Sequence, residues 1–253
     1  MGNVEFRSGT LRIAGELFLP NAARFPPPYP AVVICHGIGS RKENQSGFAG
    51  FMAQHGFAAL CFDFRGHGES EGQLDDHPLD DVSAAIDLIA GREEVDRSRL
   101  ALRGSSMGGM LALHAAARDR RVQAIAAIAP AVEAATAEWI EAGWLQALLA
   151  REHLSARIDA PAYGRYLRAH NARAEISHLA PRALLLVHCR GDELIPYTSS
   201  EELFALAREP KQLRLIEQGH HRFAQQDAGV HKTTLEWFQT YLEPAKEDFH
   251  DRF

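Results

Sequence analysis

Residues 100–110 of this chain read LALRGSSMGGM, and they contain the pattern Gly-x-Ser-x-Gly over residues 104–108. The apolar run at the start predicts a strand, and residues 110–117 predict a helix that follows it directly. At such a strand-to-helix corner the central serine takes a strained backbone conformation, and a Cβ at either glycine would collide with the neighbouring strand or helix. The pattern therefore predicts that the hydroxyl of Ser106 lies exposed at the end of a sheet, beside the N-terminal end of a helix.

The surrounding sequence separates this corner from a mere glycine-rich turn, which is the alternative interpretation of the motif. Apolar runs predict strands over residues 31–35, 57–64, 99–103, 122–129, 182–187 and 212–217. Spacing and composition predict helices over residues 47–55, 79–90, 110–117, 199–207 and 230–241. This alternation indicates right-handed βαβ units, so we expect an α/β fold with a mostly parallel central sheet flanked by helices.

The N-terminal segment departs from the alternation. Residues 4–7 and 11–19 predict two antiparallel strands, because apolar and polar residues alternate in the second of them. Residues 25–30 contain four prolines and predict an extended surface connection, since proline cannot donate a hydrogen bond to a strand ladder.

The strand pattern also stops between residues 131 and 180. A stretch of this length is too long for a bare connection, so we expect an inserted helical element. The predicted organisation is one core domain of residues 1–130 and 181–243, a helical cap insertion of residues 131–180, and a charged C-terminal tail of residues 244–253.

The insertion has two possible roles, which are packing on the sheet and covering a site as a cap that shapes an apolar pocket. Aromatic residues at helical spacing are more often core than ligand contacts. If the insertion lines a pocket, its candidate contacts are Trp139, Trp144, Tyr163 and Tyr166.

Composition bounds the class of protein. The 253 residues are 46% hydrophobic and carry a formal net charge of −6, so we expect no nucleic-acid partner. No signal core and no long apolar stretch occur, so we expect a cytoplasmic protein without a membrane partner. Cys35, Cys61 and Cys189 each lie in or at the end of an apolar run and predict buried free thiols. No metal-binding motif occurs, so no metal site is predicted, and the oligomeric state stays open, a homodimer included.

Candidate partners of the serine follow the last two predicted strands. A serine hydroxyl needs an adjacent base, itself oriented by an acid, and ligands of parallel sheets gather at the carboxyl ends of the strands. After the next-to-last strand comes Asp192, with Glu193 as the nearest rival for the acid. After the last strand come His220 and His221, and either could be the base. The order serine, acid, histidine is that of the α/β-hydrolases.

Over about residues 3–243 the sequence resembles the α/β-hydrolase superfamily, and within it the small bacterial esterases that include the feruloyl and cinnamoyl esterases. Four motifs carry the resemblance in the family's order. They are H-G-x-G at residues 36–39, D-x-R-G-x-G-x-S at residues 63–70, the serine corner, and the acid and histidine loops together. The resemblance implies an α/β-hydrolase fold and a two-step acyl transfer that needs no cofactor.

The resemblance also implies roles for individual residues. The serine at the corner is the nucleophile, and the motif H-x-x-x-D-x-x-I-P selects Asp192 as the acid. The pattern G-x-x-H-x-F selects His221 as the base, whereas a competing G-H pattern selects His220. The backbone N–H groups of Ile38 and Met107 would hold the oxyanion.

Other polar residues of these motifs are expected to support the loops. We expect His36 to brace its turn, Asp63 and Arg65 to form a loop-stabilising pair, and His67 to be a surface or loop histidine without a role.

The expected function is that of a carboxylesterase-like serine hydrolase acting on a small ester with an apolar or aromatic group. The same triad leaves open a thioesterase, a peptidase or amidase, and a perhydrolase. A non-catalytic binding protein of the same fold is the alternative from another class, because fold alone does not decide function.

Overall fold

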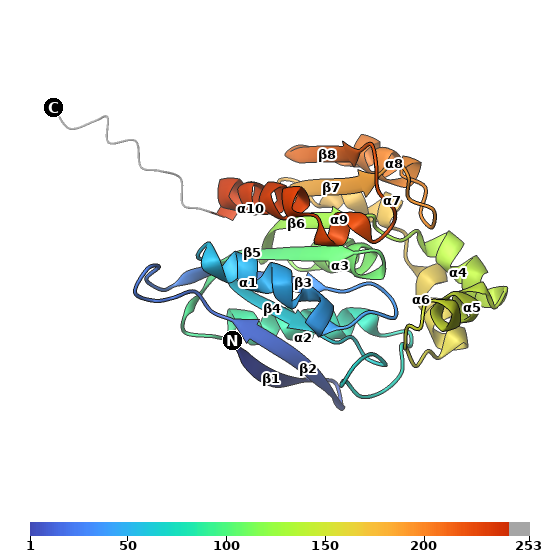
Figure 1. Cartoon of the computed structure of the whole chain (residues 1–253), viewed down its shortest axis with the longest axis horizontal. Coiled ribbons are helices and arrows are strands. Elements are labelled where there is room, and N and C mark those ends of the chain that lie inside the picture. The colour runs from blue at the N-terminus through green and yellow to red at the C-terminus, as the bar shows by residue number, and fades with distance from the viewer. Residues whose placement is uncertain (243–253) are drawn as a thin grey trace.

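One eight-stranded sheet runs through the molecule in the order β1-β2-β4-β3-β5-β6-β7-β8 (Figure 1). The computed structural model describes residues 1–242, and the predicted tail of residues 244–253 lies outside the described residues. The strands are β1 (Gly2–Ser8), β2 (Leu11–Phe18), β3 (Tyr29–Cys35), β4 (Ala58–Phe62), β5 (Val95–Ser105), β6 (Val122–Ile128), β7 (Ala183–Cys189) and β8 (Lys211–Ile216). Every predicted strand is present, and the α/β prediction is confirmed.

The strand directions explain why the motifs meet. β1 pairs with β2, and β2 with β4, in antiparallel fashion, whereas the strands from β3 to β8 are parallel to one another. The carboxyl ends of the parallel strands therefore lie at one edge, which is where ligands of such sheets bind. β4 and β7 are buried along their whole length, as their continuous apolar sequences require.

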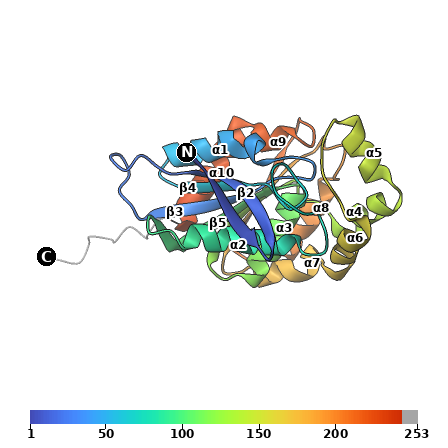
Figure 2. The ribbon, with the colours of Figure 1, turned by 90° about the horizontal axis from the view of Figure 1, so that it is seen from below.

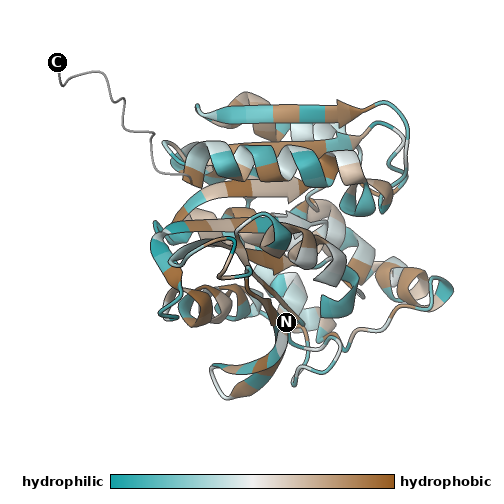
Figure 3. Ribbon diagram, turned by 60° about the vertical axis from the view of Figure 1, so that its left-hand side comes forward, coloured by the Kyte–Doolittle hydropathy of each residue, from teal (hydrophilic) through white to brown (hydrophobic). Residues whose placement is uncertain are grey.

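Helices cover both faces of the sheet (Figure 2). One face carries α1 (Ser46–Gln54) and α10 (Ala228–Leu242), and the other carries α2 (Pro78–Ala90), α3 (Met107–Arg118) and α8 (Thr198–Leu206). The central strands are predominantly hydrophobic, whereas the helices alternate hydrophobic with hydrophilic residues (Figure 3). The hydrophobic effect on two apolar sheet faces thus holds the three layers together.

The stretch predicted as an insertion forms a group of short helices. They are α4 (Glu133–Glu141), α5 (Trp144–Arg151), α6 (Ala160–Ala169), α7 (Ala172–Glu175) and the 3₁₀ turn η2 (Ile176–His178). α4, α5 and α6 gather at one end of the sheet (Figure 1).

The segment between α5 and α6 is attached to the loop that follows β4. Ile158 forms a parallel bridge with Leu74. Arg157 N–H donates to the Gly66 carbonyl at 2.8 Å, Leu74 N–H to Arg157 at 2.8 Å, and Asp159 N–H to Leu74 at 2.9 Å. Main-chain hydrogen bonds therefore fasten this helical group to the core in addition to its two chain connections.

One prediction about the N-terminal region is wrong in part. Tyr29 and Pro30 belong to β3 rather than to a surface connection, and the Tyr29 side chain is buried. The register between β3 and β5 shifts between Tyr29 and Ala31, so Pro30 sits at an irregularity where its missing N–H is tolerated. All three cysteines are buried and free, as predicted.

Candidate active site

Ser106 occupies the corner between β5 and α3. Its backbone has φ 53° and ψ −121°, which is strained for a residue with a Cβ. A Cβ added to Gly104 would overlap the carbonyl oxygen of Gly108, and one added to Gly108 would overlap that of Cys35. Ser106 is partly exposed, whereas Ser105 is fully buried. The corner therefore presents the hydroxyl of residue 106 alone.

His221 and Asp192 are brought together from the loops after β8 and β7. His221 Nδ1 lies 2.7 Å from Asp192 Oδ2, and the carboxylate is fully buried. Asp192 Oδ1 accepts the N–H groups of Leu194 at 2.9 Å and Ile195 at 2.8 Å. Because the carboxylate holds Nδ1 of the imidazole, Nε2 is left to accept a proton.

A second imidazole contacts the same carboxylate. His188 Nε2, fully buried, lies 3.2 Å from Asp192 Oδ2 and 3.0 Å from the Ile195 carbonyl oxygen, while its Nδ1 lies 2.8 Å from Ser200 Oγ. Burial alone would raise the pKa of Asp192, but the hydrogen bonds with His188 and His221 hold it well below its usual range. Asp192 is therefore a carboxylate at neutral pH.

The rival residues occupy other positions. His220 is exposed, and its Nδ1 accepts the N–H of Arg222 at 3.3 Å. Glu193 accepts the backbone N–H of His221 at 3.1 Å through its carboxylate, so it positions the histidine loop. The structure thus brings His221, and not His220, to Asp192.

The two backbone donors expected for an oxyanion lie beside Ser106. Ile38 and Met107 line the same cavity as Ser106 and His221, and neither N–H has an acceptor in the described part of the chain. A Cβ added to Gly37 would lie 3.3 Å from Ser106 Cβ, so the turn after β3 passes directly against the corner.

His36 braces the turn after β3, as expected. Its Nδ1 donates to the Gly37 carbonyl at 2.7 Å, and its Nε2 accepts Phe64 N–H at 3.1 Å. Burial lowers the pKa of His36 to about 4, so the ring is neutral, as the Nε2 acceptor role requires. His67 lies in a loop, as one of its two expected placements has it, but it is not at the surface, because it is buried and packs edge-on against His36 with the ring centroids 5.0 Å apart.

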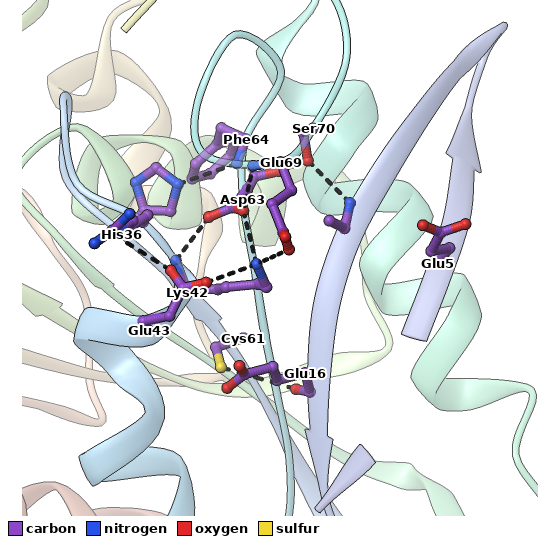
Figure 4. A network of polar contacts seen from close by, with 12 residues as sticks. Glu5, Glu16, His36, Lys42, Glu43, Cys61, Asp63, Phe64, Glu69 and Ser70 are labelled. Atoms are coloured by element: carbon purple, nitrogen blue, oxygen red, sulfur yellow. Dashed lines mark hydrogen bonds and ion pairs between the residues drawn. The ribbon is translucent and has the colours of Figure 1, made fainter. Parts of the chain in front are cut away.

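Lys42 ties this turn to the loop after β4 (Figure 4). Its backbone N–H donates to Asp63 Oδ1 at 2.7 Å, and its ammonium donates to Asp63 Oδ2 at 3.2 Å and to Glu43 at 2.8 Å. Glu69 is a further partner of the ammonium. Both Lys42 and Asp63 are buried, and burial lowers the Lys42 pKa less than these carboxylates raise it.

The predicted pair of Asp63 and Arg65 does not form. Asp63 pairs with Lys42, whereas Arg65 binds Asp81 of α2 at 2.8 Å and Asp75 at 2.7 Å. The partner of Asp63 thus precedes the loop in the sequence, whereas the two partners of Arg65 follow it.

A cavity of about 310 Å³ opens above Ser106. Its lining has an apolar wall and a polar wall. The apolar wall includes Trp139, Leu145, Leu148, Leu149, Leu154, Tyr163 and Leu194. The polar wall comprises Ser40, Asn44, Gln45, Arg222, Gln225 and Gln226.

Two of the four aromatic candidates line this cavity. Trp139 and Tyr163 do, but Trp144 and Tyr166 do not. Trp144 packs on Trp139 with the ring centroids 4.8 Å apart, and Tyr166 stacks on Tyr163 at 6.0 Å. The leucines of α5 belong to an apolar helical stripe that is visible in the sequence, so the sequence could have indicated them as lining residues. No sequence pattern indicates the glutamines of the polar wall.

Among residues 1–242, no group of three or more histidine, cysteine, aspartate or glutamate side chains could hold a metal ion. Nor is any helix in that range long and apolar enough to cross a membrane.

Comparison with known proteins gives one family match and several relatives. The family described as serine aminopeptidase, S33, matches residues 26–163. The uncharacterized protein YfhR of Escherichia coli K12 is 31% identical over 192 residues, which are 75% of this chain and 62% of YfhR. The chain thus spans less than two thirds of that relative.

Solved structures share the fold at low sequence identity. The α/β hydrolase GrgF from Penicillium has a TM-score of 0.80 at 20% identity, with 95% of this chain and 98% of that chain covered. Est1E from Butyrivibrio proteoclasticus, solved with ferulic acid bound, has a TM-score of 0.72 at 21% identity, with 92% and 98% covered.

Proposed function

The chain belongs to the serine aminopeptidase S33 family of α/β-hydrolases, and we propose that it is a serine-dependent carboxylic ester hydrolase. The observation that carries the proposal is the contact of 2.7 Å between His221 and Asp192, in one cavity with the strained, partly exposed Ser106. No other histidine of the described residues both contacts Asp192 and lines that cavity.

In the proposed reaction Ser106 Oγ attacks the ester carbonyl carbon and its proton passes to His221 Nε2. Asp192 stabilises the imidazolium, and the N–H groups of Ile38 and Met107 hold the oxyanion. The alcohol leaves with the proton from His221. His221 then takes a proton from a water molecule, which attacks the acyl carbon. The bond from that carbon to Ser106 Oγ breaks, the proton returns to Oγ, and the carboxylic acid is released.

An ester fits the cavity better than the substrate of an aminopeptidase. An enzyme that removes N-terminal residues has to bind an α-ammonium group, and a carboxylate is its natural partner. No aspartate or glutamate lines the cavity in the described part of the chain. The apolar wall from α4, α5 and the segment after it acts in this proposal as a cap that holds an apolar or aromatic group. A thioester would use the same wall and triad, and it is the second candidate.

The test combines two variants with a matched control. Replacing the nucleophile, Ser106→Ala, should lower the turnover of 4-nitrophenyl esters by about 10⁴–10⁶-fold without loss of the fold. His221→Ala should abolish labelling of Ser106 by a fluorophosphonate, while the neighbouring His220→Ala should label like the wild type. Turnover by Ser106→Ala near the wild-type rate would contradict the proposal. A kcat/KM panel of short, long and hydroxycinnamoyl esters, thioesters and aminoacyl amides separates the ester from the thioester and peptidase activities.

A further inference from the structure

A buried arginine without a carboxylate partner lies behind the polar wall of the cavity. Arg103, on β5, is fully buried and forms no ion pair with a carboxylate of the described residues. Its neighbours are neutral: Gln45 Oε1 at 3.1 Å, the Gln225 carbonyl oxygen at 2.8 Å, and the ring of Phe48 at 4.1 Å from the guanidinium carbon. Buried charges are ordinarily paired, so this one calls for an explanation.

The guanidinium fixes the orientation of a side chain that lines the cavity. Arginine can only donate hydrogen bonds, so the amide atom of Gln45 that it meets has to be the oxygen. The Nε2 group of Gln45 then turns away from Arg103, and it has no acceptor in the described part of the chain. Because Gln45 lines the cavity, a bound molecule can accept these free N–H bonds.

The side chains of residues 1–242 that line the cavity include a cation and no carboxylate. Arg222 is the only lysine or arginine among the described residues that line it, and no aspartate or glutamate does so. Arg222 reaches Glu152 at 3.6 Å near the surface, while Arg103 stays uncompensated in the interior. Burial lowers the pKa of Arg103 to about 9, so the group is still a cation at neutral pH. In a low-dielectric interior such a charge acts on a nearby anion with little screening.

We propose that the polar wall binds a carboxylate on the substrate, with Gln45 as the hydrogen-bond donor and Arg103 as the positioning residue and charge behind it. The substrate is then an ester with one apolar part, held by the cap, and one part that ends in a carboxylate. This inference rests on the proposed ester hydrolysis and narrows its substrate class.

Two matched pairs of substrates test the inference. One pair varies the acyl part, 4-nitrophenyl hydrogen adipate against 4-nitrophenyl methyl adipate. The other varies the alcohol part, 4-carboxyphenyl butyrate against its methyl ester. For each pair the ratio of kcat/KM, anionic over neutral, is compared between proteins, so the intrinsic reactivity of the substrates cancels.

Arg103→Met removes the charge, and Gln45→Glu pairs it with a carboxylate inside the wall. Both variants should lower the ratio for at least one pair by roughly tenfold or more, the range of a charge-assisted hydrogen bond. Arg99→Met is the control on the same strand, because Arg99 is ion-paired with Asp96 and does not line the cavity. Its ratio should equal that of the wild type.

The inference would be overturned if folded Gln45→Glu gave ratios of kcat/KM, anionic over neutral, within twofold of the wild type for both pairs. Gln45→Glu alone decides the test if Arg103→Met does not fold. A wild-type protein that hydrolyses none of the four esters and resists a fluorophosphonate would instead contradict the proposed function.

Discussion

Two imidazoles meet at a single oxygen of Asp192, and only one of them reaches the cavity. His188 donates through Nε2 toward Asp192 Oδ2 and the Ile195 carbonyl, and it is fully enclosed. A group that touches the acid but not the substrate acts by positioning. We therefore expect the contacts of His188 to hold the loop after β7 and, through Asp192, the orientation of His221.

We expect His188→Leu to lower kcat by about tenfold or more while KM changes little, because a misoriented base weakens the transition state more than substrate binding. The loss of a buried donor should also cost about 1–3 kcal/mol of unfolding free energy. Steady-state kinetics and urea unfolding measure the two effects. Ser200→Ala removes only the partner of the remote Nδ1 and is the milder control. Unchanged kcat in His188→Leu would show that the acid needs no such support.

At the scale of elements, a buried histidine joins the helix after the serine to the helical group above it. His114 of α3 lies 2.9 Å from Glu133 of α4 and 2.8 Å from Glu175 of α7. Burial lowers the His114 pKa, but the two carboxylates raise it further, above its ordinary value. For the carboxylate of Glu175 burial acts in the opposite direction and raises the pKa, but His114 and Arg118 lower that pKa to about 2. The ion pair is therefore intact at pH 6.

The pKa of His114 is raised in the folded protein. The contribution of its charge to the free energy of unfolding is therefore fully present below the pKa of the unfolded chain, about 6.5, and is lost as the pH rises through the pKa of the folded protein. We expect His114→Gln to lower the unfolding free energy by about 1–3 kcal/mol at pH 6 and by clearly less at pH 9. Urea unfolding of both proteins at both pH values measures this. The exposed His55, which forms no ion pair in the described part of the chain, supplies the control His55→Gln. A loss independent of pH would contradict the charged state of His114.

A second contact between elements is the pair of Lys42 and Asp63, which joins the turn after β3 to the loop after β4. We expect Lys42→Met to cost about 3–5 kcal/mol of unfolding free energy, because it leaves the buried Asp63 carboxylate without its cation. It should also reduce kcat, since the turn that carries Ile38 loses its anchor. Lys232→Met breaks an exposed pair with Glu236 and should cost less than about 1 kcal/mol. Equal losses of unfolding free energy in the two variants would show that the buried pair stabilises the fold no more than an exposed one.

The elements and the sites at their ends follow from local patterns, but the partners across the fold do not. The apolar run before Ser106 and the helical pattern after it are both visible in the sequence, and this is why the position of Ser106 is predictable. Arg65 pairs with Asp81, which lies on a helix that begins after a long loop. Nothing in the local sequence favours Asp81 over Asp63 as the partner of Arg65. Lys42 and His188 are short-range neighbours of motifs whose burial becomes visible only when the sheet is assembled.

At the scale of the whole molecule, the cavity between core and helical group should set the size of the substrate. Leu145 of α5 is buried and lines the cavity of about 310 Å³. Leu145→Trp should fill part of this space and lower kcat/KM for octanoyl esters, relative to acetyl esters, by roughly tenfold, since overpacking costs about 1–3 kcal/mol. Leu206→Trp, at a leucine that is 48% exposed, is the control. An unchanged chain-length profile in Leu145→Trp would mean that the acyl group lies elsewhere.

The main-chain ladder between residues 157–159 and the loop at Leu74 has a consequence for how molecules enter. The helical group is held by main-chain hydrogen bonds in its middle as well as by its two chain connections, so it is poorly suited to open and close. We therefore expect substrate and product to pass through the existing opening of the cavity while α4 and α5 keep their positions. Turnover should then proceed without a slow swing of α4 and α5, and the amide of Leu74 should exchange with deuterium as slowly as those of the sheet.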